Sequence, residues 1–124
     1  MDIKSFRQFL KTLADDTRLR IVFLLMNNEP LMVKEIQAIL RISQPVISRH
    51  LVRLRLLKIV SDRREGNSMY YSLHKNIENE QKKILDFFFS QFSSFEQLQN
   101  DRVMLEKIKN ERPSPANEVH NANP

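Results

Sequence analysis

The sequence contains no cysteine among its 124 residues, a single glycine and no tryptophan. The absence of cysteine excludes disulfides, thiolate metal sites, thiol redox sensing and cysteine nucleophiles. Long apolar runs are also missing, since the longest, Ile21–Met26, is far too short to span a bilayer. The first ten residues, MDIKSFRQFL, lack the apolar segment of a signal peptide. With 41% apolar residues and a length that suits one domain, we expect a soluble cytoplasmic protein that does not bind membranes.

Positive charge is concentrated in one part of the chain. The net charge is +5, but residues 41–75 hold eight Lys and Arg against two acids, so the rest of the chain carries a slight negative excess. An evenly solvated charged surface would not segregate its charge in this way. A local basic patch on a small domain favours binding to nucleic acid or another anionic surface.

The spacing of apolar residues predicts four helices in the first half of the chain. The second is apolar on nearly all sides, which is typical of a buried helix. The fourth is expected to begin at Ser43 as its capping residue, with Pro45 tolerated in the first turn. The predicted helices cover residues 3–13, 17–27 (capped by Asp15 or Asp16), 32–40 and 43–57, with a tight turn at 41–42.

The stretch IVSDRREGNSMYYSL (59–73) predicts a β-hairpin in which residues 59–64 pair with 68–73 around a Gly-Asn turn. A long helical pattern follows over 76–110, with a break near Ser93-Ser94, and the end of the chain is rich in proline. The prediction is a mainly α fold with a small β-hairpin, a winged helix-turn-helix with four helices, two strands and a last helix. Residues 1–110 would form the DNA-binding and dimerisation domain, and residues 111–124 a disordered tail.

The fourth helix is expected to have two different sides. At 100° per residue, Ile47, Leu51 and Leu54 face the core and a second set of side chains lies opposite. In a helix-turn-helix, the N-terminal residues of the second helix reach base edges in the major groove, where Gln44 can pair with adenine and Arg49 with guanine. The predicted DNA-binding residues of this helix are Ser43, Gln44, Pro45, Ser48, Arg49, Val52 and Arg53, the last as a phosphate contact.

The tip of the hairpin, RREGNS (63–68), is also basic, which favours contact with the DNA backbone or the minor groove beside the recognition helix. A surface helix that merely carried a few arginines would not have such a neighbour. His50 is expected to pack beside Leu51 or to bond to a phosphate. The predicted contacts of the wing and backbone are His50, Arg55, Arg63, Arg64, Asn67 and Ser68.

Three segments, LKTLADDTRLRIVFLL, ISQPVISRHLVRLRLLKIV and RREGNSMYYSL, resemble the ArsR/SmtB family of winged-helix transcriptional repressors, over about residues 9–73. The resemblance implies a homodimer on double-stranded DNA, with the first and last helices of each subunit packed together. It also implies a repressor that leaves its operator when an effector binds. Family members usually have a glycine where this chain has Lys58, and a left-handed residue there would cost about 1 kcal/mol.

Apolar residues at both ends of the domain also favour a homodimer. Three consecutive phenylalanines at 87–89 cannot all face one small core, and the first helix has a continuous apolar stripe. Some of these side chains should therefore bury against a partner, with an entirely intramolecular core as the alternative. A two-fold dimer would bind an inverted-repeat operator. The predicted interface residues are Ile3, Phe6, Leu10, Phe88, Phe92 and Phe95.

The chain departs from the family at its metal sites. Where relatives carry a Cys-Val-Cys motif the sequence is Leu31-Met32-Val33-Lys34, and the four ligand positions of the other family site fall on Lys75, Ile77, Phe88 and Gln91. Neither set suits a transition metal, so we expect no metal and no cofactor. The segment DRVMLEKIKNERP (101–113) resembles the C-terminal helix of relatives associated with methyltransferase or S-adenosylhomocysteine genes. That resemblance implies a small-molecule effector, and a constitutive or partner-controlled repressor is the alternative.

An enzyme is not expected, because the sequence has no glycine-rich phosphate loop, no paired carboxylates at catalytic spacing and no Ser-His-Asp arrangement. The alternative function is a winged-helix protein-interaction module without specific DNA binding. Such modules tend to lose the basic recognition face, which this chain keeps in Arg49, Arg53, Arg63 and Arg64. The sequence therefore predicts a sequence-specific DNA-binding transcriptional regulator.

Overall fold

The computed structural model describes residues 2–112. The fold is mainly helical with a small antiparallel sheet, which confirms the predicted class, and the last helix is divided where the sequence predicts a break. The structure also contains a short strand, β1, that the sequence did not predict. The elements are α1 (Ile3–Leu13), α2 (Asp16–Leu25), β1 (Leu31–Met32), α3 (Val33–Leu40), α4 (Gln44–Leu56), β2 (Val60–Glu65), β3 (Ser68–Leu73), α5 (Asn79–Phe92) and α6 (Glu96–Asn110).

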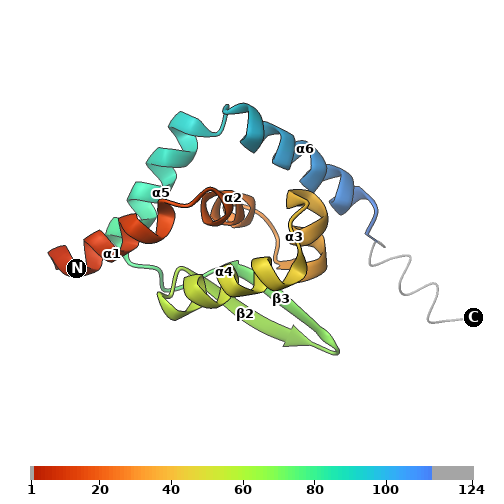
Figure 1. Ribbon diagram of the computed structural model, residues 1–124, viewed down its shortest axis with the longest axis horizontal. Coiled ribbons are helices and arrows are strands. Elements are labelled where there is room, and N and C mark those ends of the chain that lie inside the picture. The colour runs from red at the N-terminus through yellow and green to blue at the C-terminus, as the bar shows by residue number, and fades with distance from the viewer. Residues whose placement is uncertain (1, 113–124) are drawn as a thin grey trace, which may run out of the picture.

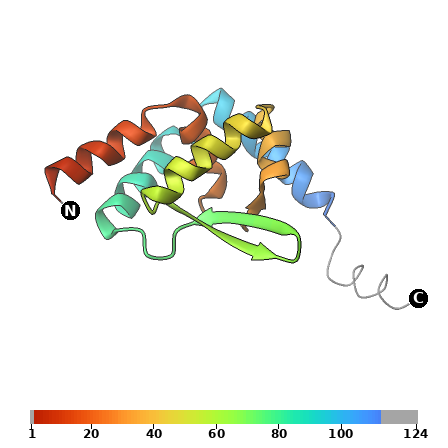
Figure 2. The same ribbon diagram turned by 60° about the horizontal axis from the view of Figure 1, so that its bottom comes forward.

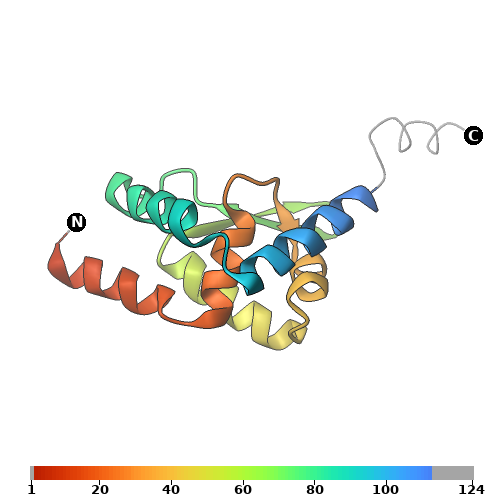
Figure 3. The same cartoon turned by 90° about the horizontal axis from the view of Figure 1, so that it is seen from above.

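Helix α2 lies in the centre of the molecule, with the other helices around it (Figure 1). Helix α4 and the β2–β3 hairpin form one side, and α6 crosses the opposite side. Figure 2 shows α4 running along the outside, next to the hairpin. Helices α1 and α5 lie together at the end of the molecule away from the C-terminal end of α6, as the view from above also shows (Figure 3). Along residues 2–112, no helix combines the length and apolar character needed to cross a membrane.

The hydrophobic core is built around α2. Every residue from Ile21 to Met26 is buried, as expected for a helix that is apolar on nearly all sides. The inward residues of α3 and α4 pack against it together with Leu85 of α5 and Leu105 of α6. The two late helices therefore belong to the same core as the helix-turn-helix.

Side-chain caps fix the starts of the first two helices. The Asp2 carboxylate accepts a hydrogen bond from the Ser5 N–H at 2.8 Å, and the Asp15 carboxylate accepts one from the Arg18 N–H at 3.0 Å. Asp15, rather than Asp16, is therefore the cap of α2. At α4 the prediction is right about the position but wrong about the group, because the Ser43 side chain makes no capping bond. The Ser43 main-chain carbonyl accepts from the Val46 and Ile47 N–H groups instead, both at 3.1 Å.

The sheet has the strand order β1-β3-β2. Strands β2 and β3 pair from Val60 opposite Leu73 to Glu65 opposite Ser68. The predicted Gly66-Asn67 turn is confirmed, but the first strand covers 60–65 rather than 59–64, because Glu65 also pairs. Gly66 has φ +60°, which only glycine adopts without strain. Two residues of β1 pair with Tyr70 and Tyr71 of β3, which ties the start of α3 to the wing. Such a short strand has no periodicity that a sequence pattern could detect.

The connection between α4 and the wing contains a residue in the left-handed backbone conformation. Lys58 has φ 59°, so this chain adopts there the conformation for which family members usually have glycine. The Lys58 N–H bonds to the Arg55 carbonyl at 2.9 Å and the Ile59 N–H to the Leu54 carbonyl at 3.0 Å. These bonds close the end of α4, and Ile59 is fully buried directly after it. The angle of the wing is thus fixed by the core despite the strain at Lys58.

Candidate nucleic-acid interface

Helix α4 presents a polar side to solvent. Ile47, Leu51 and Leu54 have no exposed surface, which confirms the predicted inward side of the helix. Gln44 and Ser48 are joined on the outer side by a hydrogen bond of 2.9 Å from Gln44 Nε2 to Ser48 Oγ. This bond holds the two polar side chains together, and each keeps further hydrogen-bonding capacity. The exposed residues of the outer side are Ser43, Gln44, Pro45, Arg49, Val52 and Arg53, and Ser48 is half-exposed.

The β2–β3 hairpin follows α4, and its tip carries exposed cations. Arg63, Arg64 and Asn67 are exposed and Ser68 is half-exposed. Arg63 forms an ion pair with Glu65 at 2.8 Å on the same strand, whereas Arg64 has no such carboxylate among residues 2–112. The wing therefore offers one arginine that is free and one that must give up a partner to bind an anion.

Arg55 points from the end of α4 to the base of the wing. Its Nη1 donates to Asp62 Oδ2 at 2.6 Å. This hydrogen bond raises the pKa of Arg55, so the guanidinium stays charged. The predicted phosphate contact is thus paired within the protein and links α4 to β2.

His50 is turned toward α2, which the sequence did not indicate. Its Nδ1 lies 3.2 Å from Nη1 of Arg18, whose Nε donates to the Thr12 carbonyl at 2.6 Å. Because a guanidinium can only donate, Nδ1 must accept and the ring proton is on Nε2. Burial lowers the pKa of His50, which agrees with a neutral ring. His50 therefore anchors α4 to α2 and keeps one N–H for another acceptor.

The residues predicted for a dimer interface lie on α1, on α5 and in the turn between α5 and α6. Phe88 is half-buried, and Phe89 packs edge-on against Phe23 of α2, with the ring centroids 5.7 Å apart. Phe88 and Phe92 line a surface hollow beside α2 together with Phe95. The side chains that remain exposed in the single chain are Ile3 (86%), Phe6 (36%), Leu10 (38%), Phe87 (57%), Phe92 (39%) and Phe95 (58%).

The positions that correspond to the family's metal sites hold side chains unsuited to a transition metal. Lys75 and Gln91 are exposed, and Ile77 and Phe88 pack partly against the core. Met32 caps α3 through its main-chain N–H, which donates to Glu35 at 2.9 Å. Within residues 2–112, no group of three or more His, Asp or Glu side chains is placed to hold a metal ion.

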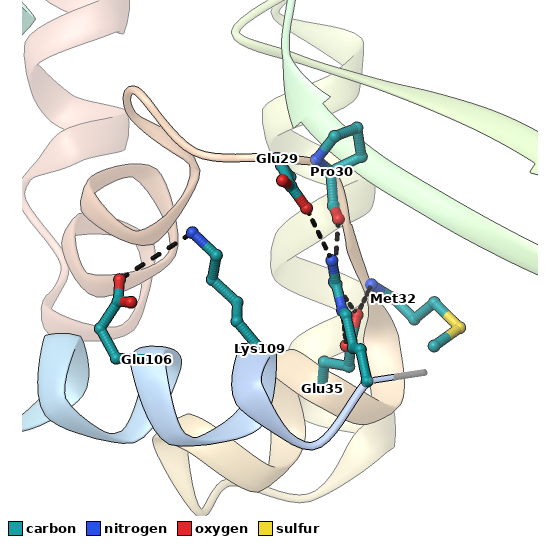
Figure 4. Close-up of polar contacts among 7 residues, drawn as sticks. Glu29, Pro30, Met32, Glu35, Glu106 and Lys109 are labelled. Carbon is teal, nitrogen blue, oxygen red and sulfur yellow. Dashed lines mark hydrogen bonds and ion pairs between the residues drawn. The ribbon is translucent and has the colours of Figure 1, made fainter. Parts of the chain in front are cut away.

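Two ion pairs fasten α6 to the helix-turn-helix, and neither was predicted. Arg20 of α2 donates to both carboxylate oxygens of Asp101 at 2.9 Å. Arg112, just after α6, donates to both carboxylate oxygens of Glu35 in α3 at 2.6 Å (Figure 4). Arg112 falls in the predicted tail, whose remaining residues, 113–124, lie outside the described residues. The partners are 81 and 77 residues apart, so no local sequence pattern could pair them.

Known proteins resemble this chain in both sequence and fold. The sequence profile described as "Bacterial regulatory protein, arsR family" matches residues 15–62. The arsenical resistance operon repressor of Escherichia coli is 43% identical over 79 residues, which cover 64% of this chain and 68% of that protein. The chain belongs to the ArsR family.

Other ArsR-family proteins extend the comparison. The arsenic resistance transcriptional regulator ArsR1 of Pseudomonas putida is 48% identical over 67 residues, covering 54% of this chain and about half, 52%, of that protein. The structure of HlyU from Vibrio cholerae superposes with a TM-score of 0.64 at 30% identity, covering 74% of this chain and 98% of HlyU. The repressor PagR of Bacillus anthracis superposes with a TM-score of 0.59 at 30% identity, covering 69% and 94%. The resemblance stated from the sequence is confirmed, and the family consists of regulators rather than enzymes.

Proposed function

We propose that this ArsR-family chain is a homodimeric transcriptional repressor that binds an inverted-repeat operator and is released by a non-metal effector. The observation that supports it best is the outer side of α4, where exposed polar and basic side chains lie next to a basic wing. This arrangement matches a helix that enters the major groove with a wing on the adjacent backbone. A protein-interaction module without DNA binding would not need an exposed basic helix next to a basic wing.

The residues of this face take different roles on DNA. Gln44, Ser48 and Arg49 lie near the start of α4 and read base edges, and Val52 lies against a thymine methyl group. The exposed side chain of Pro45 is short, which lets the helix lie deep in the groove. The remaining residues position the protein on phosphates and carry little sequence information. They are Ser43, His50, Arg53, Arg55, Arg63, Arg64, Asn67 and Ser68.

A second copy of the chain covers the apolar surface formed by Ile3, Phe6, Leu10, Phe88, Phe92 and Phe95. Five of these six side chains are exposed in the single chain, and the two helices that carry most of them lie at one end of the molecule. An exposed apolar area of this kind marks a protein interface. Two-fold symmetry would then place two recognition helices on an inverted repeat. Residues 1–110 act as the DNA-binding and dimerisation domain, with the tail after them.

The effector that releases the repressor is a small metabolite rather than a metal. Lys75, Ile77, Phe88 and Gln91 would not form a ligand set, and Leu31–Lys34 offers only the Met32 thioether. The resemblance of residues 101–113 to the last helix of relatives associated with methyltransferase or S-adenosylhomocysteine genes supports this effector class. A repressor of this kind acts on DNA in the cytoplasm.

A DNA titration tests the proposal. The duplex upstream of the chain's own gene should bind more tightly than a random duplex, with an affinity that falls steeply from 50 to 200 mM salt. Dialysis against a chelator should leave this affinity unchanged, and a change would overturn the non-metal effector. Absence of binding to the upstream duplex even at low salt would contradict the repressor and favour an interaction module.

Two arginine variants test the assigned roles. Arg49→Ala should lose about 1–3 kcal/mol of discrimination between the upstream and random duplexes, because it removes a bidentate base contact. Arg64→Ala should weaken binding to both duplexes alike and make the salt dependence shallower by about one unit per subunit. Equal losses from the two variants on both duplexes would show that the roles are wrongly assigned.

A further inference from the structure

The fold brings a basic stretch of α1 next to the end of the recognition helix. Arg7 and Lys11 of α1 line one surface hollow with Arg53 of α4. The other lining residues are Gln8, Thr12, Leu56 and Leu57, so no carboxylate enters this hollow. Three cationic side chains thus face the same space from two helices.

Lys4 extends this row along α1. Residues 4, 7 and 11 are three and four positions apart, so their side chains follow one side of the helix. On α4, Arg49 and Arg53 are also one turn apart and both are exposed. We call Lys4, Arg7 and Lys11, together with Arg53, the α1 basic track. It continues the exposed side of the recognition helix onto a separate element.

The cations of the track resemble Arg64 of the wing, and differ from Arg55 and Arg63, in having no carboxylate partner among the described residues. Along residues 2–112, no carboxylate forms an ion pair with Lys4, Arg7, Lys11 or Arg53. Arg55 and Arg63, by contrast, are each paired with an acid. Like charges held together without a counter-charge repel one another, and an anion bound between them removes this repulsion.

We propose that the α1 basic track binds backbone phosphates of the operator in the stretch between the two half-sites. The proposal rests on the proposed function and enlarges its DNA-contact surface. Its location follows from the fold, because α1 lies with α5 at the end of the molecule that the second subunit covers. The track therefore extends from the recognition helix toward the two-fold axis, where the centre of the operator passes. Side chains that contact only phosphates add affinity without reading sequence.

The double variant Arg7→Gln with Lys11→Gln tests the proposal. Both residues are exposed and glutamine is a good helix former, so folding should be preserved, and the thermal midpoint will check this. The slope of log affinity against log salt should become shallower by about 0.9 for each phosphate that the variant no longer neutralises, or about 3.6 for the four such phosphates of a dimer. Affinity should fall by the same factor on the upstream and random duplexes.

Two matched variants separate phosphate binding from other effects. Lys107→Gln with Lys109→Gln removes the same charge from α6, on the side of the molecule opposite α4, and should leave the slope near the wild-type value. Arg7→Lys with Lys11→Arg keeps the charge and should retain the slope. A track variant whose slope equals that of the α6 control would overturn the proposal.

Sedimentation of the track variant provides the last control. If the variant is monomeric at concentrations where the wild type is a dimer, α1 serves dimerisation and the proposal is wrong. Failure of the proposed function looks different, since the wild type itself would then not prefer the upstream duplex. A wild type that binds with a steep salt slope, together with an unaffected track variant, would contradict the α1 basic track alone.

Discussion

Arginine–carboxylate pairs occur in two regions of this molecule, and they differ in burial. Around α6, the carboxylates of Asp101 and Glu35 are only 4% and 7% exposed. At the wing, those of Asp62 and Glu65 are 26% and 57% exposed. In the first region each arginine donates to both oxygens of its acid, whereas Arg55 donates to a single oxygen of Asp62.

This difference in burial separates arginines that serve the fold from arginines that an external anion can reach. A buried charge that loses its partner keeps the full cost of desolvation, so the α6 pairs cannot be exchanged. An exposed pair contributes little to stability, and its arginine can turn to a phosphate at small cost. The α6 pairs therefore hold α6 to the helix-turn-helix, while the wing pairs hold exposed arginines that can exchange their acid for another anion.

Breaking the Arg20–Asp101 pair should have the largest effect. In Asp101→Asn, Arg20 loses its charged partner inside the α2, α3 and α6 packing, and about 3 kcal/mol of stability should be lost. Chemical denaturation with urea measures this loss. Glu106→Gln on the same helix is the control, because Glu106 is exposed and lies 3.9 Å from Lys109. A loss in Asp101→Asn no larger than in the control would remove the distinction between the two regions.

The Arg112–Glu35 pair should have an intermediate effect that depends on pH. Burial alone would raise the pKa of Glu35, but the bonds from Arg112 and the Met32 N–H outweigh it and hold the pKa below its ordinary value of 4.5. The pair therefore stabilises the fold fully above that value, and the stability is lost as the pH falls through the lower folded-state pKa. Glu35→Gln should cost about 2 kcal/mol at pH 7.

Measuring the urea midpoint at several pH values checks this prediction. The gap between wild type and Glu35→Gln should narrow as the pH falls below 4.5, because the wild-type carboxyl then also becomes neutral. Glu29→Gln is the matched control, since Glu29 contacts the same arginine at 3.2 Å but is 70% exposed. A gap that stays constant with pH would show that Glu35 acts through packing rather than charge.

The two regions also differed in how well the sequence predicted them. Local patterns were sufficient for α4 and the hairpin, because helix periodicity, Pro45 near the start of α4 and the Gly66 turn act over a few residues. The inward side of α4 and the position of the hairpin turn followed from these signals, whereas the pairing lies one residue later in β2 than predicted. The conformation of Lys58 could not be predicted from local signals, because it accompanies the burial of Ile59 in the core.

The α6 region and the α1 basic track depend on contacts between distant residues. Asp101 and Arg112 belong to a segment whose charges look like those of any solvated helix, and only the packing of α6 on α2 and α3 makes them structural. The charge count over residues 41–75 likewise left out Arg7 and Lys11, because chain position does not show that α1 lies beside Arg53. The contact between His50 and Arg18 crosses 32 positions, so the sequence did not show it either.

Breaking the Arg55–Asp62 pair at the wing should have the smallest effect on stability. Its effect on DNA binding tests whether Arg55 contacts phosphates. Asp62→Asn removes the acid that holds Arg55 at 2.6 Å and should leave the thermal midpoint nearly unchanged. Arg55 could then reach a phosphate without first leaving Asp62, so affinity for any duplex should rise, while the salt slope should stay near the wild-type value because the number of phosphates contacted is unchanged. Asp86→Asn is a close control, because it frees Lys82 from a pair of the same length on α5. If Asp62→Asn destabilised the fold as strongly as Asp101→Asn, the wing pair would be structural. If it left duplex affinity at the level of the Asp86→Asn control, Arg55 would have no place among the DNA contacts.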